Sequence, residues 1–504
     1  MKNNYFEKEL WFKYAIRKNF SLYAILLVII ILVFSPPASC SVISPPISIY
    51  RIHGTKDLSD SRQIKGTHGT SIKIPDGIGT DKGMEYYFQS GKTERYDLKK
   101  IAVIISEYRP GSHADAIVTK LFEGYFYGGK RYKPGVQVVS MYTDQVPDED
   151  MSRDFAAKYH FKLLPSVREA LTLTSNSSSG GRKLAVDGVM LICEHGSYPY
   201  NEIGQKLYPR FELFKQIIDV FRETGQTVPI FTDKHLSYEW FKAKWMYDQS
   251  FNLRFPLMAG SSLPFVLAPE QKFELGTPFE KAVWTWSADF IGNKDSYGFH
   301  ALEQLECRVE RREGGETGIK AVQCFEGTSV WEWTDENPWA NRLLEASVRG
   351  PIGTISFNRE NIKDPMLFVL EYNSGLQAAI YRINGQKSAE SFASYIRGKS
   401  EPVFDPKPVG ILSPVAVPDS LRSRYRYNNF SAQIYYFEQM LLTNNPPNPV
   451  ERTLLTTGTL AALCESSYLP DASMYGKSNQ HGKYLPKGRR IITSHLSISY
   501  RLPK

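Results

Sequence analysis

The sequence from Lys99 to Pro264 alternates short apolar runs with longer amphipathic segments, and this alternation restricts the possible folds more than any other feature. Apolar runs of this length suit buried strands, and the spacing of apolar residues between them suits helices. Strands that alternate with helices form a parallel sheet covered by helices on both faces. The sequence therefore predicts a doubly wound α/β domain over residues 98–264. The predicted strands lie at 99–106, 136–142, 161–164, 187–193, 228–231 and 256–259.

After Phe265 the pattern changes to apolar runs that follow one another with few helical segments between them. The turn at 372–376, Tyr-Asn-Ser-Gly-Leu, is typical of a hairpin. We therefore expect an α+β domain with a mainly antiparallel sheet over residues 265–470, followed by a tail over 471–504. The predicted strands lie at 282–289, 319–325, 351–357, 366–372 and 376–383, and the predicted helices at 298–310, 429–443 and 450–468.

Composition limits the class of protein and its partners. A chain of 504 residues with 42% hydrophobic and 23% charged residues is typical of two or three globular domains. The formal net charge of +8 is spread without a long Lys/Arg run, so we expect no nucleic-acid partner. The five cysteines show no CxxC spacing, which argues against a zinc site built on thiolates. Cys193 lies inside an apolar run and is predicted to be an inert core thiol.

The first 40 residues have the pattern of a targeting segment. Residues 1–19 are polar and basic, and residues 20–34 are almost wholly apolar. A helix of that apolar length falls short of a hydrocarbon core of about 30 Å, which favours a signal peptide over a stable span. Export to the periplasm or the extracellular space is therefore predicted, with an uncleaved membrane anchor or an N-terminal core helix as the alternatives. Residues 41–97, rich in Gly, Ser and Pro, are predicted to form a flexible linker or arm.

Charged side chains follow the predicted strands of the first domain at the points where those strands end. The carboxyl ends of parallel strands meet at one edge of the sheet, and ligands bind at that edge in open α/β folds. We therefore expect these side chains to surround one ligand site. They are Glu107, Asp144, Glu194, His195, Asp233, Lys234 and His235.

Two segments resemble motifs of the glucose–fructose oxidoreductase and inositol dehydrogenase family, Gfo/Idh/MocA. Residues 232–236, Thr-Asp-Lys-His-Leu, resemble the family's Glu-Lys-Pro motif, with Lys234 at the catalytic lysine. Residues 297–303 resemble its Asp-x-Gly-x-His-x-x-Asp segment, with His300 at the catalytic histidine and Glu303 at the second acid. The resemblance extends over residues 99–468. It implies a Rossmann-like domain that binds NAD or NADP and an oxidoreductase that transfers hydride to or from a sugar or polyol.

The first turn departs from this family. The family has Gly-x-Gly-x-x-Gly there, whereas residues 106–111 are Ser-Glu-Tyr-Arg-Pro-Gly, so that Gly111 alone survives. Those glycines let the backbone approach a pyrophosphate at the helix N-terminus. Arg109 is a candidate to grip a phosphate directly, and Asp144 is placed to bind a ribose hydroxyl. Glu194, His195 and Asp233 are further candidates for contacts with the cofactor.

The resemblance assigns roles to the predicted catalytic residues. His300 would be the general acid and base, Lys234 would stabilise the developing alkoxide, and Glu303 would orient the imidazole. If the resemblance is set aside, His300 is a helix histidine and Lys234 a solvated turn lysine. The expected partners are a small sugar-like substrate, the membrane only through the N-terminal segment, and a possible second copy of the chain.

Two other functions stay open at this stage. The first is a non-catalytic ligand-binding relative that has lost its dinucleotide site. The second is a metal-dependent hydrolase or lyase, although the chain has no HExxH spacing and we assign no metal ligand. The candidate ligands for such a metal would be Glu107, His113, Glu194, His195, Asp233 and His235.

Overall fold

The computed structural model of this protein describes residues 63–65, 71–73, 98–127, 130–174, 183–267, 270, 272–287, 294–349, 357–386, 390–406, 427–468, 475–478, 484–486 and 488–503. The predicted signal or anchor segment, 1–40, lies outside these residues. Within the predicted linker, β1 (Gln63–Lys65) pairs antiparallel with β2 (Ser71–Lys73). Among the described helices, none has both the length and the apolar character that crossing a bilayer requires.

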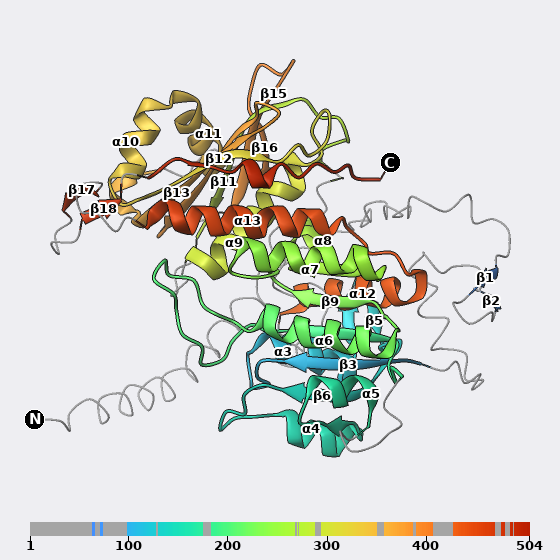
Figure 1. Ribbon diagram of the computed structural model, residues 1–504. Helices are drawn as coiled ribbons and strands as arrows, with labels where there is room; N and C mark the ends of the chain where they lie inside the picture. The colour runs from blue at the N-terminus through green and yellow to red at the C-terminus, as the bar shows by residue number, and fades with distance from the viewer. Residues whose placement is uncertain are drawn as a thin grey trace, which may run out of the picture. The chain divides into compact units, whose positions relative to one another are not determined.

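The first domain contains a six-stranded parallel sheet, as the alternating pattern predicted (Figure 1). Its order, β10-β9-β8-β3-β6-β7, corresponds to 6-5-4-1-2-3 in chain order. This is the doubly wound order of dinucleotide-binding folds, with the topological switch between β3 and β8. The predicted Rossmann-like fold class is therefore confirmed. The strands are β3 (Lys99–Ile105), β6 (Val136–Thr143), β7 (Lys162–Leu163), β8 (Gly188–Ile192), β9 (Ile230–Asp233) and β10 (Leu257–Gly260).

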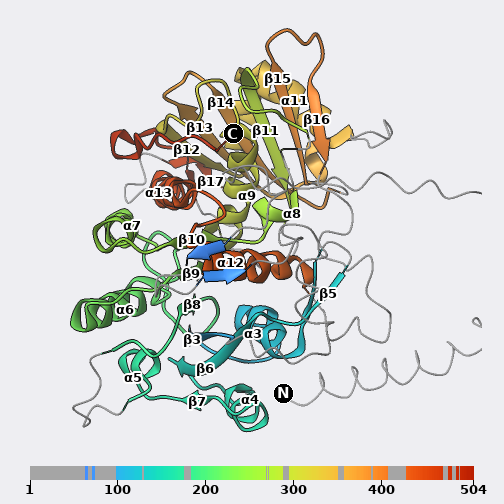
Figure 2. The same cartoon turned by 90° about the vertical axis from the view of Figure 1, so that its right-hand side faces the viewer.

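Helices cover both faces of this sheet because successive strand residues point to opposite sides. On β3, Ala102 and Ile104 pack with α5 (Val167–Thr172), α6 (Arg210–Thr224) and α7 (Trp240–Leu253). Ile101 and Val103 face the other side, toward α3 (His113–Glu123), α4 (Ser152–Tyr159) and α12 (Ser431–Thr443). Helix α12 thus comes from the far end of the chain to pack on the first sheet (Figure 2).

The segment 125–135 contains a hairpin of β4 (Tyr125–Tyr127) and β5 (Lys130–Tyr132). Its aromatic residues pack on α12: the ring of Tyr127 stacks on Tyr435 at 4.6 Å between centroids. The Tyr125 hydroxyl donates a hydrogen bond of 2.9 Å to Glu438. These partners lie about 300 residues away along the chain, so no local sequence pattern indicates this packing.

The second domain contains a seven-stranded sheet of order β16-β15-β11-β14-β13-β12-β19. All its pairings are antiparallel except β11 with β14, which confirms the mainly antiparallel prediction. The predicted strand at 351–357 falls outside the described residues except for Phe357, which is not in a strand. The strands are β11 (Phe279–Trp286), β12 (Ile319–Glu326), β13 (Lys363–Tyr372), β14 (Gln377–Asn384), β15 (Ser391–Ile396), β16 (Val403–Pro406) and β19 (Ile491–Ile492).

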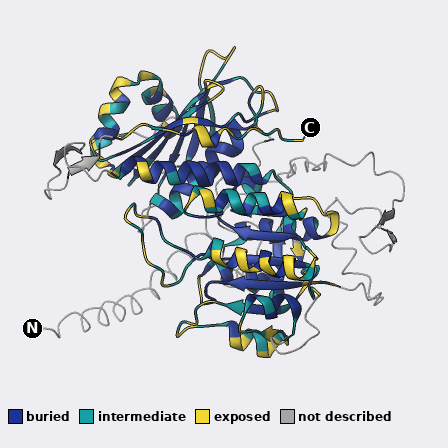
Figure 3. Ribbon diagram, viewed as in Figure 1, coloured by how far each residue is buried: buried dark blue, intermediate teal, exposed yellow. Residues whose placement is uncertain are grey.

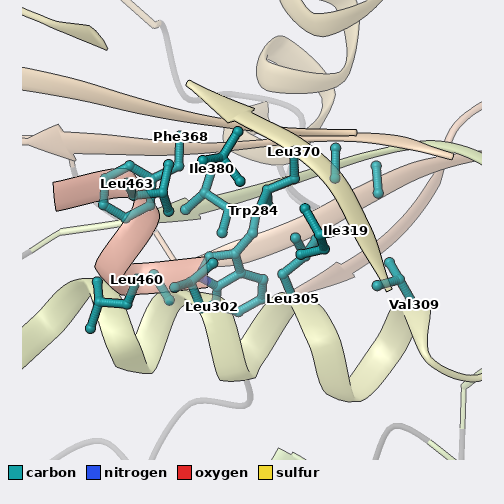
Figure 4. Packing of buried hydrophobic residues seen from close by; sticks show 14 of the residues in the cluster. Trp284, Leu302, Leu305, Val309, Ile319, Phe368, Leu370, Ile380, Leu460 and Leu463 are labelled. Carbon is teal, nitrogen blue, oxygen red and sulfur yellow. The ribbon is translucent and has the colours of Figure 1, made fainter. Parts of the chain in front are cut away.

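Helices also cover both faces of the second sheet. Trp284, fully buried, is at the centre of the face that packs on α9 (Lys294–Val309) and α13 (Val450–Ser467) (Figure 4). The opposite face packs on α10 (Ser329–Glu336) and α11 (Pro338–Arg349), which the sequence did not predict. The sheet is consequently buried on both sides by helices of the same chain (Figure 3). A second subunit could not pair through the sheet faces that these helices cover.

The remaining elements are short, and several belong to the C-terminal tail. Strand β19 of the tail joins the second sheet beside β12, and the hydroxyl of Tyr500 donates a hydrogen bond of 2.7 Å to buried Glu310. The tail therefore contributes to the second domain. The other elements are α8 (Leu263–Leu267), the pair β17 (Tyr475–Ser478) and β18 (Tyr484–Pro486), and the 3-10 turns Arg359–Asn361, Asn428–Phe430 and Ser494–Leu496.

Candidate functional site

Lys234 directly follows β9 and has a left-handed backbone conformation, with φ of +69°. Its backbone exchanges two hydrogen bonds with Gly260, at 3.2 and 3.1 Å, which form an isolated antiparallel bridge at the end of the parallel pairing of β9 with β10. Positive φ is uncommon for a residue with a side chain and concentrates at functional sites. Lys234 is only 3% exposed, so the alternative of a solvated turn lysine is wrong.

The buried ammonium of Lys234 lies among three groups from other elements. Its Nζ atom is 2.6 Å from Nε2 of His300, on α9, and donates to the carbonyl of Ser296 at 3.3 Å. Oε1 of Glu194, which follows β8, lies 3.6 Å away. An ammonium can only donate, so Nε2 of His300 accepts and the ring proton of the neutral imidazole is on Nδ1. The structure thus brings the two predicted catalytic residues together from different domains.

Glu194 is held between Lys234 and Arg210, the first residue of α6. Arg210 is fully buried and its Nη2 atom donates to Oε2 of Glu194. Burial alone would raise the pKa of Glu194, but the charges of Lys234 and Arg210 hold it well below its ordinary value. Glu194 therefore stays a carboxylate that balances the two cations. Sequence reasoning missed Arg210, since it follows Pro209 at the start of a helix and no strand end marks it.

His235 and Asp295 lie in the interior beside Arg210. Nη1 of Arg210 is 3.1 Å from Nε2 of His235, and Oδ1 of Asp295 lies 3.7 Å from the same nitrogen. Burial, with the nearby Arg210 charge, lowers the pKa of His235 well below its ordinary value, so the ring is neutral. Burial raises the pKa of Asp295 to about 6. The neutral His235 ring therefore helps to position Arg210, which in turn holds Glu194.

Glu303 does not bind His300 through a direct hydrogen bond. Its carboxylate accepts from the backbone N–H of Ser261 at 3.0 Å and from the Ser261 hydroxyl at 2.5 Å. The nearest contact with the imidazole, from Oε2 to Nδ1 of His300, measures 3.9 Å. Complete burial raises the pKa of Glu303 to about 7, which the Ser261 hydrogen bonds oppose. The predicted orientation of His300 by Glu303 is therefore corrected to a longer electrostatic contact.

A second group of side chains surrounds Asp233, the residue before Lys234. Nδ1 of His113, at the start of α3, lies 2.5 Å from Oδ2 of the buried Asp233 carboxylate. The backbone N–H of His113 donates to Nδ1 of His195 at 3.2 Å. Burial lowers the pKa of His195 to about 4, so this ring is neutral near pH 7. Like Lys234, His195 has a positive φ, of +74°.

The N-terminus of α3 is capped by the chain's own side chains. The Ser112 hydroxyl accepts from the N–H of Asp115 at 3.1 Å, and the Asp115 carboxylate accepts from the N–H of Gly111 at 2.9 Å. With the His113 N–H bound to His195, three of the backbone donors around this turn have partners within the chain. Dinucleotide-binding folds direct such donors at a pyrophosphate. The backbone of this turn therefore does not fit that group, and phosphate contacts would have to come from side chains.

Arg109 and Asp144, also predicted to contact the cofactor, lie outside the groups around Lys234 and Asp233. Arg109 pairs with Glu107 at 2.6 Å, and its side chain is 35% exposed. Asp144, at the end of β6, is exposed and accepts from the hydroxyl of Tyr198 at 2.7 Å and from that of Tyr142 at 3.2 Å. Both side chains can reach solvent, and they follow the neighbouring strands β3 and β6. These two residues fit a phosphate and a ribose hydroxyl by chemistry and accessibility.

Of the predicted site residues, the structure gathers some around the two adjacent residues Asp233 and Lys234. Gly111, Arg109 and Asp144 are placed around the rim of the same sheet edge. Within the described ranges, no three His, Cys, Asp or Glu side chains are grouped so that they could hold a metal ion. The gathered residues are Glu194, His195, Asp233, Lys234, His235, His300 and Glu303.

Comparison with known proteins gives structural matches only. No protein-family model matches the sequence, and no curated protein does. GenD2 from gentamicin A biosynthesis, in complex with NAD, has a TM-score of 0.44 at 11% identity, covering 73% of this chain and 93% of that chain. Myo-inositol dehydrogenase from Lactobacillus casei, in complex with NAD(H) and myo-inositol, has a TM-score of 0.42 at 14% identity, covering 73% and 94%.

A third structural neighbour is biliverdin reductase from Synechocystis, in complex with biliverdin and NADP+. Its TM-score is 0.39 at 12% identity, with 73% of this chain and 98% of that chain covered. Each of these three neighbours is described as a complex with a nicotinamide dinucleotide.

Proposed function

We propose that this protein is an oxidoreductase of the Gfo/Idh/MocA type, which transfers hydride between NAD(P) and a hydroxyl-bearing carbon of a sugar or polyol. The observation that supports this most directly is the contact of 2.6 Å between Lys234 and His300 at the carboxyl edge of the parallel sheet. The pair joins a cationic donor to a neutral imidazole, which are the two groups needed to move a hydroxyl proton. Nicotinamide, when bound, supplies the acceptor or donor of the hydride.

The chain's own residues would handle the proton and the charge. In the oxidation direction, Lys234 would pass a proton from Nζ to Nε2 of His300 and take the hydroxyl proton of the substrate in its place, so that an ammonium again stabilises the developing alkoxide. The Glu194 carboxylate lies 3.6 Å from the Lys234 ammonium and balances its charge, which offsets the cost of burying that ammonium. Because these groups are held before any ligand arrives, little reorganisation is required during the reaction.

Cofactor contacts in this proposal come from side chains. Asp144 would accept from a ribose hydroxyl, and the Arg109 guanidinium would bind a phosphate oxygen, with Glu107 holding the arginine. The backbone donors at Gly111 and His113 take no part, since they are already bonded within the chain. We therefore expect the affinity for the dinucleotide to depend strongly on Arg109. In a protein with a glycine-rich turn, the backbone of that turn would supply part of this affinity.

The full chain can test this proposal directly. The purified protein is denatured, and released small molecules are identified by mass spectrometry; binding of NAD+ and NADP+ is then measured by calorimetry for wild type, Arg109→Gln and Asp144→Asn. We expect a nicotinamide dinucleotide to bind, with weaker binding in both variants, and polyol-dependent reduction that follows the nicotinamide absorbance. Absence of both bound nucleotide and measurable binding would reject the proposal.

A second candidate function is a non-catalytic ligand-binding protein that has lost its dinucleotide site. The capping of α3 by Ser112, Asp115 and His195 favours it, because that is where a pyrophosphate is held in related folds. The same experiment separates the two functions. Binding of myo-inositol without any nicotinamide dinucleotide and without turnover would support the second candidate.

We also propose that residues 1–40 direct the protein out of the cytoplasm, as a cleaved signal or as a membrane anchor. The support is the apolar run at 20–34 preceded by a basic segment. Cell fractionation and N-terminal sequencing of the mature protein would test this. A mature protein that begins near residue 40 indicates cleavage, an intact N-terminus in the membrane fraction indicates anchoring, and an intact cytoplasmic protein contradicts the proposal.

A further inference from the structure

The carboxylate of Asp233 is fixed from both of its oxygen atoms. Oδ2 lies 2.5 Å from Nδ1 of His113, and Oδ1 accepts from Nε2 of Gln433 at 3.1 Å. Gln433, on α12, is itself held because the same nitrogen donates to the carbonyl of Gly260 at 2.9 Å. Asp233 and Gln433 are both fully buried. The aspartate therefore presents one oxygen to His113 in a fixed direction.

This arrangement determines which nitrogen of His113 carries the proton. A carboxylate can only accept, so in the neutral ring the proton is on Nδ1 and the lone pair is on Nε2. No described group is bonded to Nε2 of His113, although the ring packs edge-on against Phe430 at 4.9 Å. The side chain is 15% exposed, which leaves it accessible to a small ligand. A histidine oriented by a buried aspartate in this way is a competent base.

His195 lies beside this ring with the opposite tautomer. Its Nδ1 atom accepts from the backbone N–H of His113, so the proton of the neutral ring is on Nε2. The two ring centroids are 5.2 Å apart. One neighbouring imidazole therefore offers a lone pair, and the other offers an N–H. A hydroxyl group can both donate and accept, whereas a phosphate oxygen can only accept and would be repelled by a lone pair.

We propose that His113, with its tautomer fixed by Asp233, is a second ligand-facing base of this site and accepts the hydrogen bond of a ligand hydroxyl through Nε2. Lys234 and its partner His300 contact one oxygen of the ligand, and His113 contacts another. Asp233, which holds His113, and Lys234 are consecutive residues, so the two contacts depend on adjacent positions of the chain. The ligand is thus a compound with at least two hydroxyl groups; this substrate class rests on the proposed function, but the role of His113 does not.

The variant Asp233→Asn gives a sharp test of the tautomer. Gln433 donates to the position of Oδ1, so it selects the asparagine orientation whose carbonyl oxygen faces Gln433 and whose amide nitrogen faces His113. The amide then donates to Nδ1 and forces the ring proton onto Nε2. Nitrogen-15 NMR of the histidine-labelled full chain should show His113 with its lone pair on Nε2 in wild type and on Nδ1 in the variant. A wild-type ring protonated on Nε2 would overturn the proposal.

Reactivity toward diethyl pyrocarbonate gives a second readout that needs neither cofactor nor turnover, since this reagent modifies unprotonated imidazole nitrogen. Mass spectrometry should show modification of His113 in wild type, slowed on the order of tenfold by Asp233→Asn. Excess myo-inositol should also slow it. The exposed His160 at the end of α4 is the control, and its reaction should not change. A His113 rate that responds to neither the variant nor myo-inositol would contradict the proposal.

The variant His113→Asn keeps a donor for Asp233 and removes Nε2, so the fold should be retained. We expect it to weaken binding of myo-inositol, measured by calorimetry on the full chain, by about tenfold or more. Unchanged binding in a folded variant would count against the role of His113. Failure of the oxidoreductase proposal would instead appear as absence of dinucleotide binding, while the tautomer and the reactivity of His113 would be unaffected.

Discussion

The ammonium of Lys234 donates to Nε2 of His300 across 66 residues of chain, and the contact joins β9 of the first sheet to α9 beside the second. The two nitrogen atoms are within hydrogen-bond distance, so a proton can pass directly between them. This coupling is the feature of the site that the following experiment addresses.

Replacing Lys234 by methionine removes the amine that contacts His300, while it keeps an apolar stem of similar length. We expect kcat for polyol oxidation to fall by about 10²-fold or more, because one member of a proton-transfer pair is lost. Arg210 still balances Glu194, so the variant should fold. The control is Lys244→Met on α7, whose side chain is 43% exposed and pairs with Asp248 at the surface. Equal effects of the two substitutions would show that Lys234 has no special role.

The buried ion pair of Arg210 and Glu194 should be costly to break from one side. Arg210→Met leaves the carboxylate with Lys234 alone and should lower the free energy of unfolding by about 3–5 kcal/mol, measured by urea denaturation. Adding Glu194→Gln leaves the buried Lys234 ammonium without its carboxylate, so we expect a further loss of stability. Arg168→Met, in the exposed pair with Glu223, should change stability by about 1 kcal/mol or less. A double variant more stable than Arg210→Met would refute this explanation.

Glu438 should make stability depend on pH. Burial raises its pKa from 4.5 to about 8, although hydrogen bonds from Tyr125 and Gly135 oppose the shift. Between these two pH values the folded protein binds a proton that the unfolded chain has released, so stability falls as pH rises through this window. Each pKa unit corresponds to about 1.4 kcal/mol, so the decline amounts to a few kcal/mol.

The variant Glu438→Gln removes this contribution, so we expect a flatter dependence of the free energy of unfolding on pH than in wild type. The control is Glu465→Gln, an exposed glutamate that pairs with Arg489 at the surface. Denaturation series at several pH values would give both slopes. Parallel slopes for Glu438→Gln and wild type would mean that Glu438 does not titrate in this range.

Gly260 should tolerate no side chain. Its φ is +107°, and an added Cβ atom would lie 2.5 Å from Oε1 of Glu303 and 2.9 Å from the Thr453 hydroxyl. Gly260→Ala should therefore displace Glu303 and disturb the backbone pairing with Lys234, in addition to the cost of about 1–2 kcal/mol for a left-handed alanine. Gly225→Ala, with φ of +66° and open space around it, measures that backbone cost alone. Equal losses in thermal denaturation would exclude the proposed displacement.

Local pattern was sufficient for most of the first domain. The apolar runs of β3, β8 and β9 are buried on both faces, so their composition alone distinguishes them from the helices between them. The placement of Lys234 at the end of β9 follows from the same pattern, since parallel strands all end at one edge. The two helices α10 and α11 escaped prediction, although they cover an entire face of the second sheet.

The site itself shows where sequence reasoning stops. Its residue types could be recognised from the strand ends and from two motif-like segments, which identified Lys234, His300 and Glu194. The sequence could not identify Arg210, Gln433 or the role of His113, because their meaning depends on partners 16 to 200 residues away.

By itself, the sequence determined that this chain contains a doubly wound domain followed by a mainly antiparallel one, because hydrophobic periodicity and turn residues act over a few neighbours. Only the tertiary structure decided that α12 returns to the first sheet, that the N-terminus of α3 is capped from within, and that Asp233 and Lys234 each face a histidine from another element. Those outcomes depend on long-range packing and on pairing of buried charges. Both are set by distances between segments that no local pattern records.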